Sequence, residues 1–176
     1  MADLVRIVPY DPAWPKEFEA EKARLKPILA PWLGDEIHHV GSTSVPGLAA
    51  KPVIDILAEV HSLEESRAAI APLQEQLSYW WAPYQQERMN WFCKPSPEHR
   101  THHLHLVVPG SQAWREELAF RDALRAEPET ARAYEDLKRR LPRSTSTTAR
   151  RTPSPRPNSS RPSWRECSAT RRDRPA

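Results

Sequence analysis

The sequence predicts a mixed α+β fold, in which a β-sheet is flanked by helices and followed by a disordered C-terminal tail. Three observations predict it. Residues 52–60 (PVIDILAEV) are dense in apolar and β-branched side chains, other segments place apolar residues at helical spacing, and the composition changes abruptly after residue 141. The chain has 176 residues, enough for one ordinary domain or a small domain plus a tail. We therefore expect a domain over residues 1–141 and a tail over residues 142–176.

The first predicted element is a helix that begins near Asp11. An aspartate caps the free N–H groups of a first helical turn, and proline is tolerated there, which suits Pro12 and Pro15. Apolar side chains then recur close to helical spacing at Phe18, Leu25, Leu29 and Trp32. Because Pro27 lacks an N–H group and clashes with the preceding turn, we expect it to bend this helix or end it early.

The middle of the chain predicts strands on both sides of a second helix. The predicted strands lie at residues 36–40, 52–60, 79–84, 88–94 and 102–108, and the helix lies at residues 63–77. The polar segment 85–87 would form the turn between the third and fourth strands. Ser111 is then expected to cap another helix, and Pro128 to open a last one. The predicted order is α, β, β, α, β, β, β, α, α.

The basic charge of the chain is concentrated in its last 35 residues. Residues 142–176 contain nine arginines and two acidic residues, a net charge of +7, whereas the rest of the chain has a net charge of −4. Trp164 is the one large hydrophobic residue there, so this segment is expected to be disordered. Three interpretations stay open: a basic arm for RNA or acidic lipid, a solvated tail without a role, or a shifted reading frame near codon 142, which we favour.

The composition also excludes several classes of protein. No stretch approaches about 20 consecutive apolar residues, so a membrane-spanning helix is not expected. The first residues do not combine a cationic segment with an apolar one, so a signal peptide is not expected either. Cys93 and Cys167 are too few for a disulfide framework and lack the CxxC spacing of zinc sites. We expect a cytoplasmic protein with reduced cysteines.

Two of the four glycines lie in one loop, HHVGSTSVPGLAAKPVIDI at residues 38–56. Glycine permits positive φ and close backbone approach, and the hydroxyls of Ser42, Thr43 and Ser44 with nearby N–H groups could hold an anion. An ordinary polar turn is the alternative. The context favours a site, because Lys51 closes the loop and Asp55 follows within an apolar strand, where a carboxylate needs a cation, a metal or hydrogen-bond donors.

Strand alternation places further polar side chains on shared faces. Asp55, Leu57 and Glu59 share one face of their strand, and His103 and His105 share one face of theirs. Two imidazoles at this spacing can reach a divalent metal or a phosphate. The alternative is that both rings pack in the core against aromatic side chains. Additional cations that could line the same cleft are Arg88, Lys94 and Arg121.

Five segments taken in order resemble the GrpB family of small bacterial proteins: VGSTSVPGLAAKPVIDI, RMNWFCK, RTHHLHLVV, FRDALR and YEDLKRRL. The resemblance implies a nucleotidyltransferase-like fold, in which a Gly-Ser turn cradles a triphosphate and a D-x-D strand binds Mg²⁺. Gly41 and Ser42 match the Gly-Ser pair, and Asp55 matches the first carboxylate. Leu57 stands where the second carboxylate is expected, and Glu59 lies roughly 6–7 Å further along the strand.

The resemblance therefore implies a nucleotidyltransferase that moves a nucleotidyl group from a nucleoside triphosphate to an unspecified acceptor. The alternative is an inactive nucleotide- or phosphate-binding module of the same fold, and an RNA-associated protein acting through the basic tail ranks last. The residues expected to contact phosphate are Gly41, Ser42, Thr43, Ser44, Lys51, Arg88, Lys94 and Arg121. Asp55 is the expected catalytic residue, and Asp55, His103 and His105 would hold a divalent metal (Mg²⁺, Mn²⁺ or Zn²⁺). The nucleotidyltransferase-like fold would turn the two imidazoles toward Asp55, so an imidazole nitrogen is expected within about 6 Å of an Asp55 oxygen. No membrane partner is expected, and the sequence leaves the oligomeric state open.

Overall fold

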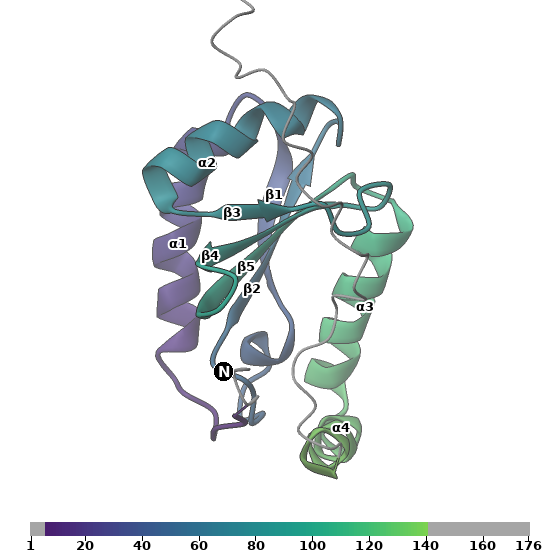
Figure 1. Ribbon diagram of the computed structural model, residues 1–176. Helices are drawn as coiled ribbons and strands as arrows, with labels where there is room; N and C mark the ends of the chain where they lie inside the picture. The colour runs from purple at the N-terminus through teal and green to yellow at the C-terminus, as the bar shows by residue number, and fades with distance from the viewer. Residues whose placement is uncertain (1–5, 141–176) are drawn as a thin grey trace, which may run out of the picture. The chain divides into compact units, whose positions relative to one another are not determined.

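The computed structural model describes residues 6–140, which form a five-stranded sheet with helices on both faces (Figure 1). The predicted α+β class and the predicted order of helices and strands are confirmed. The elements are α1 (Trp14–Leu29), β1 (Leu33–Val40), the 3₁₀ turn η1 (Ser42–Ser44), β2 (Ile54–Val60), the 3₁₀ turn η2 (Glu65–Ala69), α2 (Ile70–Leu77), β3 (Trp80–Ala82), β4 (Asn90–Pro95), β5 (Arg100–Val107), α3 (Gln112–Ala126) and α4 (Pro128–Arg140). The predicted tail, residues 142–176, lies outside the described residues.

The sheet has the strand order β1-β2-β5-β4-β3. Strand β5 pairs with β2 in parallel, and the other neighbouring strands are antiparallel. The parallel register sets Asp55 beside His103 and Leu57 beside His105. Residues separated by 48 positions in the chain therefore become lateral neighbours on one face of the sheet.

The two faces of the sheet are covered by different helices (Figure 1). Helices α1 and α2 pack on the face that presents Ile54, Ile56 and Leu104, all 1% exposed or less, in the main hydrophobic cluster. Helix α3 covers the opposite face, where Leu57 packs in a second cluster with α3 residues such as Leu118. The period-two alternation of β2 thus separates an apolar face from one that mixes apolar and polar side chains. Within residues 6–140, none of the helices has the length and hydrophobicity needed to cross a membrane.

Three details of the predicted helices are corrected by the structure. Helix α1 continues past Pro27 to Leu29, because the proline lies in the last turn and the burial of Leu25 and Leu29 holds that turn against the core. The Asp11 side chain accepts a hydrogen bond from the Ala13 N–H before the helix and does not cap it. The predicted helix at residues 63–77 is divided into η2 and α2. Ser111 caps α3 as expected, through the Trp114 N–H.

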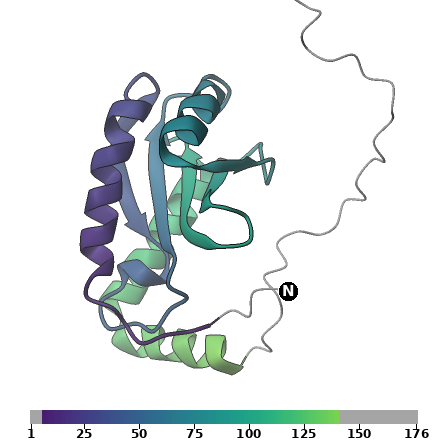
Figure 2. The same ribbon diagram turned by 60° about the vertical axis from the view of Figure 1, so that its left-hand side comes forward.

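Helix α4 runs crosswise to the end of α3, as Figure 2 shows. It lies against the segment that follows β1, because Glu135 accepts a hydrogen bond from the Ala49 N–H and Lys138 donates one to the Ala49 carbonyl. Helix α4, the last one described, therefore reaches the loop that the sequence singles out.

Candidate functional site

The loop between β1 and β2, residues 41–51 and here called the Ser42 loop, begins with a glycine that no other residue could replace without strain. Gly41 has φ +67° and ψ −172°, a conformation open essentially to glycine. A Cβ atom built on Gly41 would overlap the Oδ2 atom of Asp55 and lie 2.9 Å from the Cβ and Cγ of the same side chain. The Asp55 carboxylate is therefore packed directly against the start of the loop.

Two of the three hydroxyls in this loop stabilise the loop itself. The Ser44 hydroxyl donates to the Gly41 carbonyl at 2.7 Å. Thr43 Oγ1 donates to the Val53 carbonyl and accepts from Nε2 of His39, each at 3.1 Å. Burial lowers the pKa of His39 to about 4, so this imidazole is neutral at pH 7. Within residues 6–140, the Ser42 hydroxyl is the one of the three that accepts a hydrogen bond from a cation, Lys138.

Asp55 and His103 form a hydrogen-bonded pair. Nδ1 of His103 lies 2.8 Å from Oδ1 of Asp55, in agreement with the expected proximity of an imidazole to this carboxylate. The His103 ring also packs on Trp91, with ring centroids 5.2 Å apart, so the aromatic contact of the alternative interpretation is present as well. Nε2 of His103 is buried and has no hydrogen-bond partner within the described part of the chain. An aspartate on Nδ1 leaves Nε2 as the ring nitrogen available to another group.

His105, the second predicted imidazole, has a different partner. Its Nδ1 lies 2.8 and 2.9 Å from the two carboxylate oxygens of Glu117 on α3. Burial acts to lower the pKa of His105, but the hydrogen bond and charge of Glu117 outweigh it, so the pKa is raised. The Glu59 carboxylate also has hydrogen-bond partners: its Oε1 lies 2.7 Å from Nε1 of Trp114 and 2.9 Å from Nε2 of His38.

These contacts decide whether the predicted histidine and carboxylate ligands could hold a metal ion. Among residues 6–140, no three His, Cys, Asp or Glu side chains are grouped closely enough to hold a metal ion. Asp55 and His103 are together, whereas His105 and Glu59 are each bonded to other side chains. The structure therefore does not bring Asp55, His103 and His105 together as the predicted ligands of one metal. Binding of a single metal by Asp55 and His103 stays a prediction.

Three cations from α3 and α4 converge on the backbone around the Ser42 loop. Arg125 donates to the Ser44 carbonyl from Nε at 3.0 Å and from Nη2 at 2.8 Å. Arg121 donates to the His39 carbonyl at 3.5 Å, and Lys138 donates to Ser42 Oγ at 3.2 Å. Burial lowers the pKa of Lys138. Sequence reasoning found Arg121 but missed Arg125 and Lys138, because the docking of α3 and α4 against the loop cannot be read from a local pattern.

The other predicted cations lie in different places. Arg88 pairs with Glu116 at 2.5 Å. It lies just before β4, whose first residue, Asn90, pairs with Leu106 near the C-terminal end of β5. Lys94 is buried on the α1 face of the sheet, where it forms an ion pair with Glu21. Lys51 does lie in the Ser42 loop and is partly buried. The structure therefore does not bring Arg88 and Lys94 to the loop. Arg88 precedes β4 and pairs with Glu116 on α3, and the Lys94 side chain lies on the face of the sheet that α1 covers.

Comparison with known proteins agrees with this architecture. The family model described as GrpB protein matches residues 4–152. The chain belongs to the GrpB family. The crystal structure of the conserved protein GrpB from Enterococcus faecalis is similar to it, with a TM-score of 0.68, 37% sequence identity, and coverage of 77% of this chain and 82% of that one.

Curated members of the family are longer than the stretch they share with this chain. A UPF0157 protein of Pseudomonas aeruginosa is 43% identical over 145 residues, which are 80% of this chain and 58% of that protein. The UPF0157 protein YqkA of Bacillus subtilis is 40% identical over 141 residues, which are 78% of this chain and 39% of that protein. This GrpB family chain thus spans about two fifths to three fifths of these relatives.

Proposed function

We propose that this GrpB family protein binds a phosphorylated small molecule, with a nucleoside triphosphate as the reference ligand, beside the Ser42 loop. The observation that carries the proposal is the convergence of Arg121, Arg125 and Lys138 on the backbone around this loop. Cations held in fixed positions favour the binding of a phosphate group. The Ser42 hydroxyl, already bonded to Lys138, would donate to a phosphate oxygen, and Lys51 would add a further positive charge.

Transfer of a nucleotidyl group is the second candidate function, and the Asp55–His103 pair favours it. In this reaction an acceptor hydroxyl attacks the α-phosphorus of the triphosphate, pyrophosphate leaves, and the hydroxyl proton must be removed. Nε2 of His103 could take that proton, because Asp55 holds Nδ1 and stabilises the imidazolium that forms. A divalent metal would neutralise charge on the triphosphate. The proton transfer to His103 does not itself require a metal.

Isothermal titration with ATP, GTP, CTP and UTP tests the binding proposal. Lys138→Gln should weaken binding about tenfold or more, since it removes a charged contact to phosphate. Lys26→Gln, an exposed substitution on α1, serves as the matched control and should leave binding unchanged. Absence of binding by all four nucleotides and by pyrophosphate at millimolar concentration would overturn the proposal.

Release of pyrophosphate separates transfer from binding. Incubation of the protein with each nucleotide and Mn²⁺ should release pyrophosphate if the second candidate is correct. Asp55→Asn should then abolish release while nucleotide binding persists, because this carboxylate orients His103 and does not contact the cations on the loop. Binding without release in the wild-type protein would identify a binding module.

A further inference from the structure

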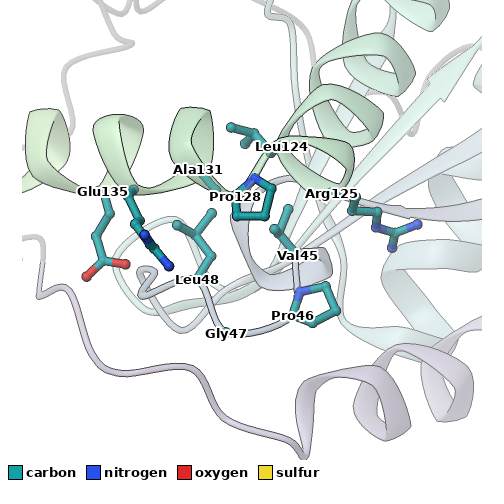
Figure 3. Close-up of a pocket in the computed structure, with 10 residues that line it drawn as sticks. Val45, Pro46, Gly47, Leu48, Leu124, Arg125, Pro128, Ala131 and Glu135 are labelled. Carbon is teal, nitrogen blue, oxygen red and sulfur yellow. The ribbon is translucent and has the colours of Figure 1, made fainter.

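A cavity of about 560 Å³ lies on the side of the Ser42 loop that faces the corner between α3 and α4 (Figure 3). The loop contributes residues 45–48, and the two helices contribute residues between Leu124 and Glu135. Its volume is within the range of about 300–1,000 Å³ that is typical of small-molecule sites. Neither Asp55 nor His103 lines it.

The floor of the cavity is apolar and well packed. Val45, Leu48 and Leu124 are 2–3% exposed and form a hydrophobic cluster of their own, against which Ala131 is packed. Figure 3 shows the side chains of Val45, Leu48 and Leu124 gathered between the loop and the helices. At Gly47, a built Cβ atom would meet no atom of the described residues within 4 Å, so this part of the wall is open. The surface that lines the cavity is mainly apolar, so a planar or branched apolar group of ligand size could rest there.

The rim of the cavity has a net positive charge. It contains two guanidinium groups, Arg125 and Arg132, and one carboxylate, Glu135. The Glu135 carboxylate is already compensated, because it accepts hydrogen bonds from Arg139 at 2.6 Å and from the Ala49 N–H at 3.2 Å. Arg125 donates to the Ser44 carbonyl, which carries no net charge, so this contact does not neutralise the guanidinium group.

We propose that this cavity binds a small organic anion, with an apolar ring-sized body on the Val45–Leu48–Leu124 floor and one acidic group against Arg132 on the rim. The apolar floor disfavours a purely polar ligand, which would lose hydration without gaining hydrogen bonds there. The charged rim disfavours a neutral or cationic one. A carboxylate and a phosphate monoester share the required chemistry. The cavity shares Arg125 with the phosphate site proposed at the Ser42 loop, whereas Arg132 and the apolar floor are not part of that site.

Three probes with the same aromatic body test the proposal: 2-naphthoate, 2-naphthyl phosphate and the neutral 2-naphthalenemethanol. We expect at least one anion to bind with a Kd of about 0.5 mM or tighter, and the neutral probe to bind about tenfold more weakly. Whichever anion binds more tightly identifies the acidic group. Amide signals of Leu48 and Ala131 should shift on titration in a nuclear magnetic resonance spectrum of the full chain.

Two variants on α4 decide whether the probe occupies this cavity. Ala131→Trp fills it and should weaken anion binding about tenfold or more, whereas Ala133→Trp, on the exposed side of the same helix, should not change it. Arg132→Glu changes only an exposed side chain and should remove the preference for the anions over the neutral probe. Equal binding of all three probes, or anion binding unchanged by both Ala131→Trp and Arg132→Glu, would overturn the proposal.

Discussion

Replacing Gly41 by alanine tests whether the Asp55 carboxylate is packed against the Ser42 loop. The added methyl group would overlap Asp55 Oδ2 and would hold a φ of +67° with ψ at −172°. That backbone conformation costs a non-glycine residue about 1–3 kcal/mol. Displacing Asp55 would also break its hydrogen bond to His103, and a bond to a charged group contributes about 1.5–3 kcal/mol. We expect Gly41→Ala to lower the free energy of unfolding by about 2.5–6 kcal/mol.

Urea denaturation followed by tryptophan fluorescence measures this loss, and Gly47→Ala provides the matched control. Gly47 also has positive φ, +78°, but within the described residues a Cβ atom there would have no neighbour within 4 Å. It should cost about 1–2 kcal/mol from backbone conformation alone. In an Asp55→Ala background the cost of Gly41→Ala should fall, because the overlapping oxygen is gone. The reasoning is refuted if the two glycine substitutions cost the same, or if the Asp55→Ala background makes no difference.

Three further predictions concern the ionisable groups. Asp55→Asn should weaken Mn²⁺ binding measured by calorimetry while the protein stays folded; unchanged affinity would exclude this carboxylate as a ligand. His39 has a folded pKa of about 4 against an ordinary value of 6.5. Its contribution to the free energy of unfolding is therefore present above pH 6.5 and is lost as the pH falls toward 4. The loss is about 3 kcal/mol and should be absent in His39→Gln. The raised pKa of His105 has the opposite sign: its stabilisation is present below pH 6.5 and is lost as the pH rises through the folded pKa. The stability difference between wild type and Glu117→Gln should therefore shrink above neutral pH, and a difference that grows there would contradict the assigned pair.

The sequence by itself determined the order of the elements and the faces on which the polar residues lie. Alternation along a strand is a local property with a period of two, so Asp55 is separated from Ile54 and Ile56, and His103 is separated from Leu104, whatever the strand order is. The special role of Gly41 was also visible, because a glycine followed by three hydroxyl residues after a strand indicates a tight loop.

Only the tertiary structure decided which partner each polar residue has. Asp55 contacts His103 because β5 enters the sheet beside β2 in parallel, and His105 contacts Glu117 because α3 docks on that face. Neither arrangement follows from the local pattern, since strand order and helix docking minimise exposed apolar area over the whole domain. Lys138 shows the same limit: its position on an amphipathic helix suggests a solvated side chain, and its contact with Ser42, 96 residues away, exists because α4 folds back against the loop.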